Sequence, residues 1–300
     1  MSNATKLGFI GLGVMGEPMC RNMCRNMSET GMGSMIVFDI SPDPVERLQA
    51  LGARKADSIA DVSRFADIIF LSLPGGPEVE KIILGGDGLL ANGRAGQIVV
   101  DMSTCPAAIA RKAAARLQEK DMMFADAPVA RTRQAAEEGT LSIMVGGDEG
   151  TYHRIRPILS AAATDITHCG GVGAGQAVKL LNNMLLIQSV VALAEAFTIS
   201  ERAGVTREVL ADALSKGSAD SFALRNHGRK AMVPGNFPVG AFGTDYAYKD
   251  ISYALELAAD CGVGSPAGEL AKSLLERTSE AGYGKEYFPV LIKLIEELRH

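Results

Sequence analysis

The sequence lacks a surplus of basic residues and any long uninterrupted apolar run. Of its 300 residues, 30 are Lys or Arg and 35 are Asp or Glu, so the formal net charge is −5. This balance argues against nucleic acid as the main partner, which would require a basic face. The most apolar long stretch, residues 178–203, contains two asparagines, one glutamine and two glutamates. It therefore predicts a buried helix and no membrane span.

Cysteine and histidine are also scarce. Five cysteines, an odd number in a chain of this length, predict a reduced, cytoplasmic protein without a disulfide framework. Cys20 and Cys24 are one helical turn apart, but no second pair of metal ligands accompanies them. The four histidines stand apart from one another in the sequence. We therefore expect no metal site.

The first 170 residues alternate short β-branched runs with helical patterns. This order predicts an α/β fold with a doubly wound, mostly parallel sheet. The expected strands are Lys6–Ile10, Met35–Asp39, Asp67–Leu71, Gln97–Met102, Met122–Ala125, Leu141–Val145 and Asp165–Thr167. The expected helices include Pro18–Met27, Pro44–Leu51 and Ala107–Gln118, and clusters of Gly and Pro at 74–77, 85–88 and 146–148 predict turns.

After residue 175 the pattern becomes purely helical, with no convincing strand beyond residue 170. One long helix is expected over residues 176–203. Shorter helices are expected at Arg207–Leu214, Asp245–Cys261, Pro266–Ala281 and Pro289–Leu298. We therefore expect an α/β domain over residues 1–170 and an all-α domain over residues 171–300, joined by the long helix.

A glycine-rich loop follows the first expected strand and precedes a helix. It reads Gly11, Leu12, Gly13, Val14, Met15, Gly16. This G-x-G-x-x-G pattern in a strand–turn–helix context is typical of a Rossmann domain, where the loop and helix N-terminus bind a dinucleotide pyrophosphate. Asp39 closes the second strand and can accept hydrogen bonds from ribose hydroxyls. Because no Arg or Lys follows within seven residues, we expect NAD as cofactor in preference to NADP.

Two polar side chains share one face of the long apolar helix. Lys179 and Asn183 are four residues apart and are therefore neighbours on a helix. A lysine in such surroundings either extends its ammonium group to solvent or occupies a pocket. A partly desolvated lysine can exchange a proton near neutral pH, which suits the acid–base partner of a hydride transfer.

These motifs resemble those of the β-hydroxyacid dehydrogenase family, which includes 3-hydroxyisobutyrate dehydrogenase and lies within the 6-phosphogluconate dehydrogenase superfamily. The resemblance covers nearly the whole chain. Its four segments are the cofactor motif at 8–19, the start of the substrate motif at Asp126–Val129, the catalytic motif G-x-x-G-x-G-x-x-x-K-x-x-x-N at Gly170–Asn183, and Lys249-Asp250.

The resemblance implies a role for each matching residue. Lys179 is the catalytic acid–base and Asn183 orients the substrate. The cofactor is lined by Leu73, Pro74 and Thr104, and Lys249 lies near the nicotinamide. Residues 1–170 then form an NAD-binding domain, and residues 171–300 form a domain for substrate binding and for assembly into a homodimer or homotetramer. The local sequence alone offers another interpretation, in which Ser103 and Thr104 cap the helix that starts near Pro106.

The substrate motif departs from the family pattern after Val129. The family often continues with a serine and two glycines, whereas this chain has Ala130, Arg131 and Thr132. An arginine–threonine pair at this point resembles sulfolactaldehyde reductases, where it binds a sulfonate. We expect Arg131 and Thr132, with Asn182 or Asn183, to bind an acidic head group. Alternatively, Arg131 is a surface residue paired with a nearby glutamate, at position 137 or 138.

The sequence thus predicts an NAD-dependent dehydrogenase or semialdehyde reductase acting on a small anionic hydroxy acid. In the reducing direction, Lys179 protonates the carbonyl oxygen while NADH supplies the hydride. 3-Sulfolactaldehyde is one candidate substrate. Alternatives are 3-hydroxyisobutyrate, tartronate semialdehyde or another 3-hydroxy carboxylate, or a non-catalytic NAD-binding role.

Overall fold

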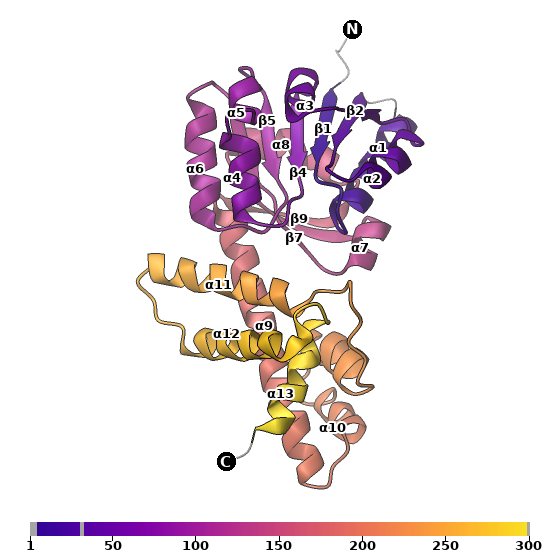
Figure 1. Ribbon diagram of the computed structural model, residues 1–300, viewed down its shortest axis with the longest axis vertical. Coiled ribbons are helices and arrows are strands. Elements are labelled where there is room, and N and C mark those ends of the chain that lie inside the picture. Colours follow the sequence, from indigo (N-terminus) through magenta and orange to yellow (C-terminus); the bar gives the residue numbers. More distant parts are fainter. Residues whose placement is uncertain (1–4, 31–32, 299–300) are drawn as a thin grey trace. The chain divides into compact units, whose positions relative to one another are not determined.

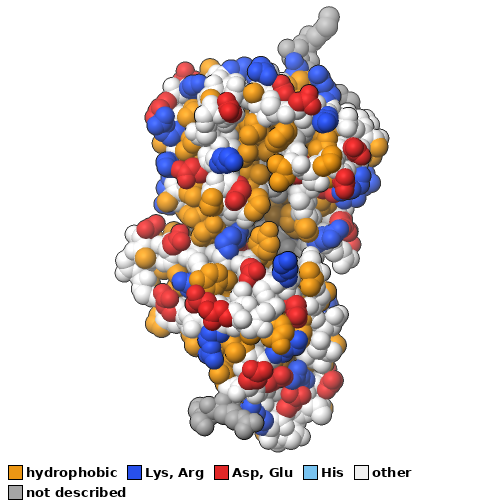
Figure 2. All heavy atoms as spheres, in the orientation of Figure 1, with side chains coloured by type: hydrophobic (Ala, Val, Ile, Leu, Met, Phe, Trp, Pro, Cys, Tyr) orange, Lys and Arg blue, Asp and Glu red, His pale blue; other side chains and the backbone are white. Residues whose placement is uncertain are grey.

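The computed structural model describes residues 5–30 and 33–298. The chain divides into two compact units, with the boundary between Lys179 and Leu180. Unit 1 contains the sheet, and unit 2 is helical in the residues described (Figure 1). Acidic and basic side chains are interspersed on the face of each unit that Figure 2 displays.

Unit 1 is built on a nine-stranded sheet in the order β3-β2-β1-β4-β5-β6-β8-β7, with β9 paired to β8. The first six of these strands run parallel, and the β6–β8 and β7–β8 pairs are antiparallel. The strands are β1 Lys6–Ile10, β2 Ser34–Phe38, β3 Arg54–Lys55, β4 Ile68–Leu71, β5 Ile98–Asp101, β6 Met123–Asp126, β7 Val129–Ala130, β8 Leu141–Gly146 and β9 Ala163–Gly170. The predicted doubly wound, mostly parallel fold is confirmed.

Helices cover both faces of this sheet, which explains why the central strand β4 is apolar at every position. Phe9 and Phe70 face one core together with helices α1, α2 and α8, whereas Ile69 and Leu71 face a second core with α3, α4 and α6. The helices of unit 1 are α1 Gly16–Thr30, α2 Pro42–Gln49, α3 Ile59–Phe65, α4 Gly76–Leu84, α5 Leu89–Asn92, α6 Ala107–Gln118, α7 Arg133–Glu138 and α8 Glu149–Leu159.

Unit 2 is built around the distal part of α9, Ala174–Arg202. By length and apolar composition α9 could cross a membrane. Its apolar residues from Ile187 to Phe197 instead form the core of unit 2 with Leu224, Ile251 and Phe288. The other helices are α10 Arg207–Leu214, the π-helix η1 Leu224–Met232, α11 Thr244–Asp260, α12 Pro266–Thr278, the π-turn η2 Ser279–Tyr283, the 3-10 turn η3 Phe288–Leu291 and α13 Ile292–Glu297.

The structure corrects several expected elements. The cluster at residues 74–77 is only partly a turn, because α4 begins at Gly76 and Pro77 fits the first helical turn. The helix expected over Pro266–Ala281 ends at Thr278, and the one expected over Pro289–Leu298 starts as a 3-10 turn. Strands β3 and β7, each two residues long, have too few positions to show a periodic pattern.

Candidate active site

The glycine loop has the geometry that its sequence predicts. Gly11 adopts φ +92°, and a Cβ there would lie 2.2 Å from the carbonyl oxygen of Ser72. A Cβ on Gly16 would lie 2.0 Å from the carbonyl oxygen of Gly11, so the turn closes only without side chains. Around Gly13, in contrast, the described residues other than its chain neighbours place no heavy atom within 4 Å of where a Cβ would be. The backbone is therefore open at the one glycine where a pyrophosphate must approach.

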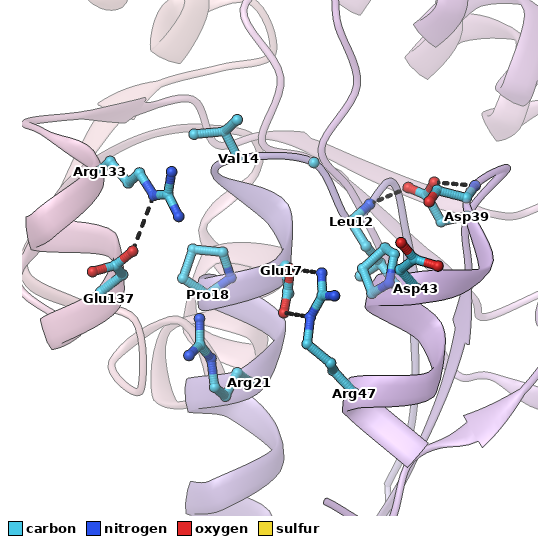
Figure 3. A pocket seen from close by; sticks show the side chains of 13 residues that line it. Leu12, Val14, Glu17, Pro18, Arg21, Asp39, Asp43, Arg47, Arg133 and Glu137 are labelled. Atoms are coloured by element: carbon cyan, nitrogen blue, oxygen red, sulfur yellow. Dashed lines mark hydrogen bonds and ion pairs between the residues drawn. The ribbon is translucent and has the colours of Figure 1, made fainter. Parts of the chain in front are cut away.

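A cavity of about 590 Å³ lies beside this loop, between the starts of α1 and α2. Asp39 forms part of its wall (Figure 3), one residue beyond the end of β2. One carboxylate oxygen accepts the Leu12 amide at 2.5 Å, and the other accepts the Ser41 amide at 2.7 Å. Asp39 thus joins the glycine loop to the second strand and lines the cavity. The loop and the cavity fit a dinucleotide.

Leu73 and Thr104 follow β4 and β5 at the carboxyl edge of the sheet, where open α/β sheets bind ligands. The two loops are connected, because the Ser103 hydroxyl accepts the Leu73 amide at 2.9 Å. Ser103 and Thr104 do not cap the following helix, whose N-cap is Pro106. That local interpretation was wrong because Ser103 is engaged by the neighbouring loop.

Two buried carboxylates end adjacent strands at this edge. Asp101 and Asp126 are register partners on β5 and β6. Burial raises the pKa of Asp101 to about 6, although it accepts the Ser103 amide at 3.0 Å. Burial also raises the pKa of Asp126, against two backbone hydrogen bonds of 2.7 Å from Gly173 and Gln176. Asp126 thereby holds the start of α9 against the sheet.

Gln176 makes a second connection from α9 to the same edge. Its side chain is fully buried, and its Nε2 donates to the Ser103 carbonyl at 2.7 Å. Its Oε1 accepts the Cys105 amide at 3.1 Å, so the two bonds flank Thr104. Sequence reasoning missed Gln176 and Asp101, and it named Asp126 only as the start of the substrate motif, without this supporting role. The first aspartate of the substrate motif was the only available signal.

Arg131 lies outside the buried network, on a strained backbone. It adopts φ +88°, a region that favours glycine, which is the residue the family often has there. Its guanidinium donates to Asp165 at 2.5 Å, to Thr164 at 2.9 Å and to the Thr140 carbonyl at 2.5 Å. The expected alternative partners were wrong, since Glu137 pairs with Arg133 and Glu138 with Gln134. Thr132 caps α7, accepting the Ala135 amide at 3.4 Å.

Lys179 and Asn183 lie one turn apart on α9. Both are buried, with 9% and 3% of their surface exposed. In unit 2 the Asn183 amide donates to Asp250 at 2.6 Å, and its oxygen accepts from Asn182 at 3.1 Å. Lys249 places its ammonium 3.2 Å from the other Asp250 oxygen. Asp250 is thus the residue that orients Asn183. It stood beside Lys249 in the sequence motif, but nothing there signalled this contact.

Comparisons with known proteins agree with this geometry. Residues 6–171 match the family described as the NAD-binding domain of 6-phosphogluconate dehydrogenase. Residues 173–295 match the family described as NAD-binding of NADP-dependent 3-hydroxyisobutyrate dehydrogenase.

Similar proteins span the whole chain. It is 36% identical to 2-(hydroxymethyl)glutarate dehydrogenase of Eubacterium barkeri, over 99% of this chain and 97% of that protein. It is 35% identical to NAD-dependent L-serine dehydrogenase of Pseudomonas aeruginosa, over 97% and 98%. The solved 3-hydroxyisobutyrate dehydrogenase of Mycobacterium tuberculosis with L-serine superposes with a TM-score of 0.88, at 30% identity over 98% of this chain and 99% of that one.

The fold, the glycine loop and these likenesses together define an NAD-binding oxidoreductase that acts on hydroxyl groups. More narrowly, the chain belongs to the β-hydroxyacid dehydrogenase family, the group that contains 3-hydroxyisobutyrate dehydrogenase.

Proposed function

We propose that the protein interconverts a small anionic 3-hydroxy acid and its aldehyde, with Lys179 as the proton-transferring residue and Asn183 as the substrate-orienting one. The proposal depends on the Lys179–Asn183 pair. A buried lysine lies one helical turn from a buried asparagine, whose amide is fixed by Asp250. An apolar core would not need either group, and a buried polar group is stable only when it is held.

The residues proposed to hold NAD are those of the cavity and the sheet edge. They are Gly11, Leu12, Gly13, Val14, Met15, Gly16 and Asp39, with Leu73, Pro74 and Thr104. Lys249, on α11 of unit 2, is added from the family motif alone. When bound, the nicotinamide supplies or accepts the hydride. We assign residues 1–170 to cofactor binding and residues 171–300 to substrate binding and assembly.

In the proposed reduction, the Lys179 ammonium donates a proton to the carbonyl oxygen as negative charge develops on it. In the oxidation, the neutral amine accepts that proton. Asn183 has one N–H left after its bond to Asp250, and this N–H can donate to the substrate. Asn182 holds the Asn183 oxygen and thereby fixes the side-chain rotamer.

We propose Arg131 and Thr132 as the residues that select the acidic head of the substrate, with 3-sulfolactaldehyde as the first candidate. The guanidinium matches a multi-oxygen anion, but its bond to Asp165 must open or be shared for it to do so. A carboxylate substrate is the alternative, supported by the names of the similar proteins, which act on a hydroxymethylglutarate and on L-serine.

The first experiment is NADH oxidation by the purified protein with four aldehydes: sulfolactaldehyde, tartronate semialdehyde, methylmalonate semialdehyde and succinic semialdehyde. A preference in kcat/KM for the sulfonate supports the Arg131 assignment. A preference for a carboxylate would change the proposed substrate class and would leave the proposed roles of Lys179 and Asn183 unchanged. NADH binding without turnover of any of the four would favour the non-catalytic role and would contradict the assignment of Lys179.

We further propose that the protein is cytoplasmic and assembles as a homodimer or homotetramer through residues 176–300. Leu181 and Leu185 support the assembly, because they lie one turn apart on α9 and are 43% and 62% exposed. Light scattering coupled to size-exclusion chromatography tests it. A monomer at micromolar concentration would contradict the assembly proposal.

A further inference from the structure

The cavity beside the glycine loop contains an arginine that is already paired. Arg47, on α2, is the eighth residue after Asp39 and lines the same cavity. Its Nε donates to one oxygen of Glu17 at 2.7 Å, and its Nη2 donates to the other at 2.8 Å (Figure 3). Glu17 is the second residue of α1, directly after Gly16. The pair therefore joins the starts of the two helices that flank the cavity.

Two hydrogen bonds join Glu17 and Arg47, and the two side chains differ in how much of their surface is exposed. The Glu17 side chain is 19% exposed, whereas that of Arg47 is 58% exposed. The parallel N–H···O bonds use the fork geometry that arginine offers to carboxylates and phosphates alike. A second arginine of the cavity wall, Arg133, donates to Glu137 at 3.0 Å. Each of these two arginines thus has its own glutamate. The third arginine of the wall, Arg21, lies four residues after Glu17 on α1 and has no bonded partner among the described residues. The hydrogen bond from Arg47 lowers the pKa of Glu17, and the charge of Arg21 lowers it too.

Freeing the Arg47 guanidinium from Glu17 would change which dinucleotide binds best. The 2′-phosphate of NADP carries close to two negative charges and three acceptor oxygens, which a guanidinium fork matches. Asp39 opposes this phosphate through like charge and accepts the hydroxyls that NAD offers instead. The effect of Asp39 is weakened if a cation of the same cavity can swing toward the phosphate. Arg47 is exposed and lines the same cavity as Asp39, so it is the cation that removal of Glu17 would release there.

We propose that Glu17 is a second determinant of NAD selectivity, which acts with Asp39 by holding the Arg47 guanidinium away from the 2′-phosphate position. Glu17 is a positioning residue in this scheme, because it works through Arg47. The inference rests on the assignment of the cavity to NAD, and it adds how the chain disfavours NADP.

The test measures dissociation constants for NADH and NADPH by titration of nicotinamide fluorescence, without substrate. The variants are Glu17→Gln, Arg47→Gln and the double variant. Glu17→Gln is expected to tighten NADPH binding at least about fivefold at low ionic strength and to change NADH binding less than about twofold. The gain in NADPH affinity should be smaller in 0.5 M salt. The Arg47 guanidinium would attract the 2′-phosphate across solvent, where salt screens the interaction. The gain should disappear in Glu17→Gln/Arg47→Gln.

Glu80→Gln is the matched control. It removes the carboxylate of another surface pair, in which Lys112 lies 2.5 Å from Glu80, outside the cavity. The control makes the same change in net charge, so it should leave both constants unchanged. An equal NADPH gain in this control would show a general charge effect and overturn the proposal.

Two further outcomes would overturn it. The first is a Glu17→Gln variant that gains nothing for NADPH, or whose gain persists without Arg47. The second is an Arg47→Gln variant that loses NADH binding, because Arg47 would then be a direct ligand. Wild-type protein that bound neither dinucleotide would instead refute the cofactor assignment itself, and this proposal with it.

Discussion

The buried histidine of unit 2 makes the stability of the protein depend on pH in a way that can be calculated. His227 lies in η1 among Phe222, Tyr287 and Phe288, with 6% of its surface exposed. Burial lowers its pKa from 6.5 to about 4. The Tyr287 hydroxyl lies 2.5 Å from Nδ1, and Nε2 has no hydrogen-bond partner among the described residues. The folded site therefore accommodates a neutral ring and disfavours the protonated one.

The sign of the effect follows from which state binds the proton. Between pH 4 and 6.5 the unfolded chain protonates this histidine and the folded chain does not, so acid favours unfolding. The stabilising contribution is complete above pH 6.5 and is lost as the pH falls toward 4. For pKa values of 6.5 and about 4, the loss at pH 5 is about 2 kcal/mol, and the full difference is about 3 kcal/mol.

The assay compares wild type with His227→Gln, which keeps an acceptor for the Tyr287 hydroxyl but does not titrate. Urea unfolding is followed by circular dichroism at pH 8, 7, 6 and 5. The difference in unfolding free energy between the two proteins should shrink by about 2 kcal/mol from pH 8 to pH 5. His153→Gln, which removes an exposed histidine on α8, is the control. A difference in unfolding free energy between wild type and His227→Gln that did not vary with pH would refute the reasoning.

Three other predictions follow from the site. Lys179→Ala should lower kcat at least about 10²-fold while the NADH dissociation constant is retained, and single-turnover kinetics with unaltered rates would assign proton transfer to another group. Asp165→Asn should lower KM for the acid substrate if Arg131 binds it, and Arg131→Ala should raise it, whereas two unchanged KM values would make the Arg131–Asp165 pair purely structural. Asp101, with its pKa raised to about 6, contributes stability below pH 3.8 that is lost as the pH rises through 6. Relative to Asp101→Asn, wild type should therefore lose about 3 kcal/mol of unfolding free energy between pH 3.8 and pH 7, and opposite slopes in urea titrations would contradict this sign.

The sequence was sufficient for the elements with a strong periodic signal. β1, α6 and α10 have the expected bounds, because their apolar positions repeat over a full face and Gly, Pro or Thr marks an end. The two-residue strands β3 and β7 and the six-residue α7 were missed, because only tertiary pairing specifies elements so short.

The placement of the candidate residues was predictable where type and spacing are local, although their roles stay predictions. The glycine loop, Asp39 and the Lys179–Asn183 pair are local patterns of this kind. The contacts of Gln176 and Asp250 were not predictable, since they are made with residues 71–73 and 67 positions away. Arg131 shows the same limit, as its partner Asp165 lies 34 residues along the chain.

The network around Asp126 and Gln176 has a consequence for where the chain can be cut. A fragment ending at residue 170 would leave both Asp126 oxygens without their amide donors from Gly173 and Gln176. It would also remove the hydrogen bonds that join the Ser103 carbonyl and the Cys105 amide to Gln176. The first turn of α9 is therefore an integral part of the Rossmann unit, although the family match to that unit ends at residue 171. An autonomous nucleotide-binding fragment of this chain should include the residues through Lys179.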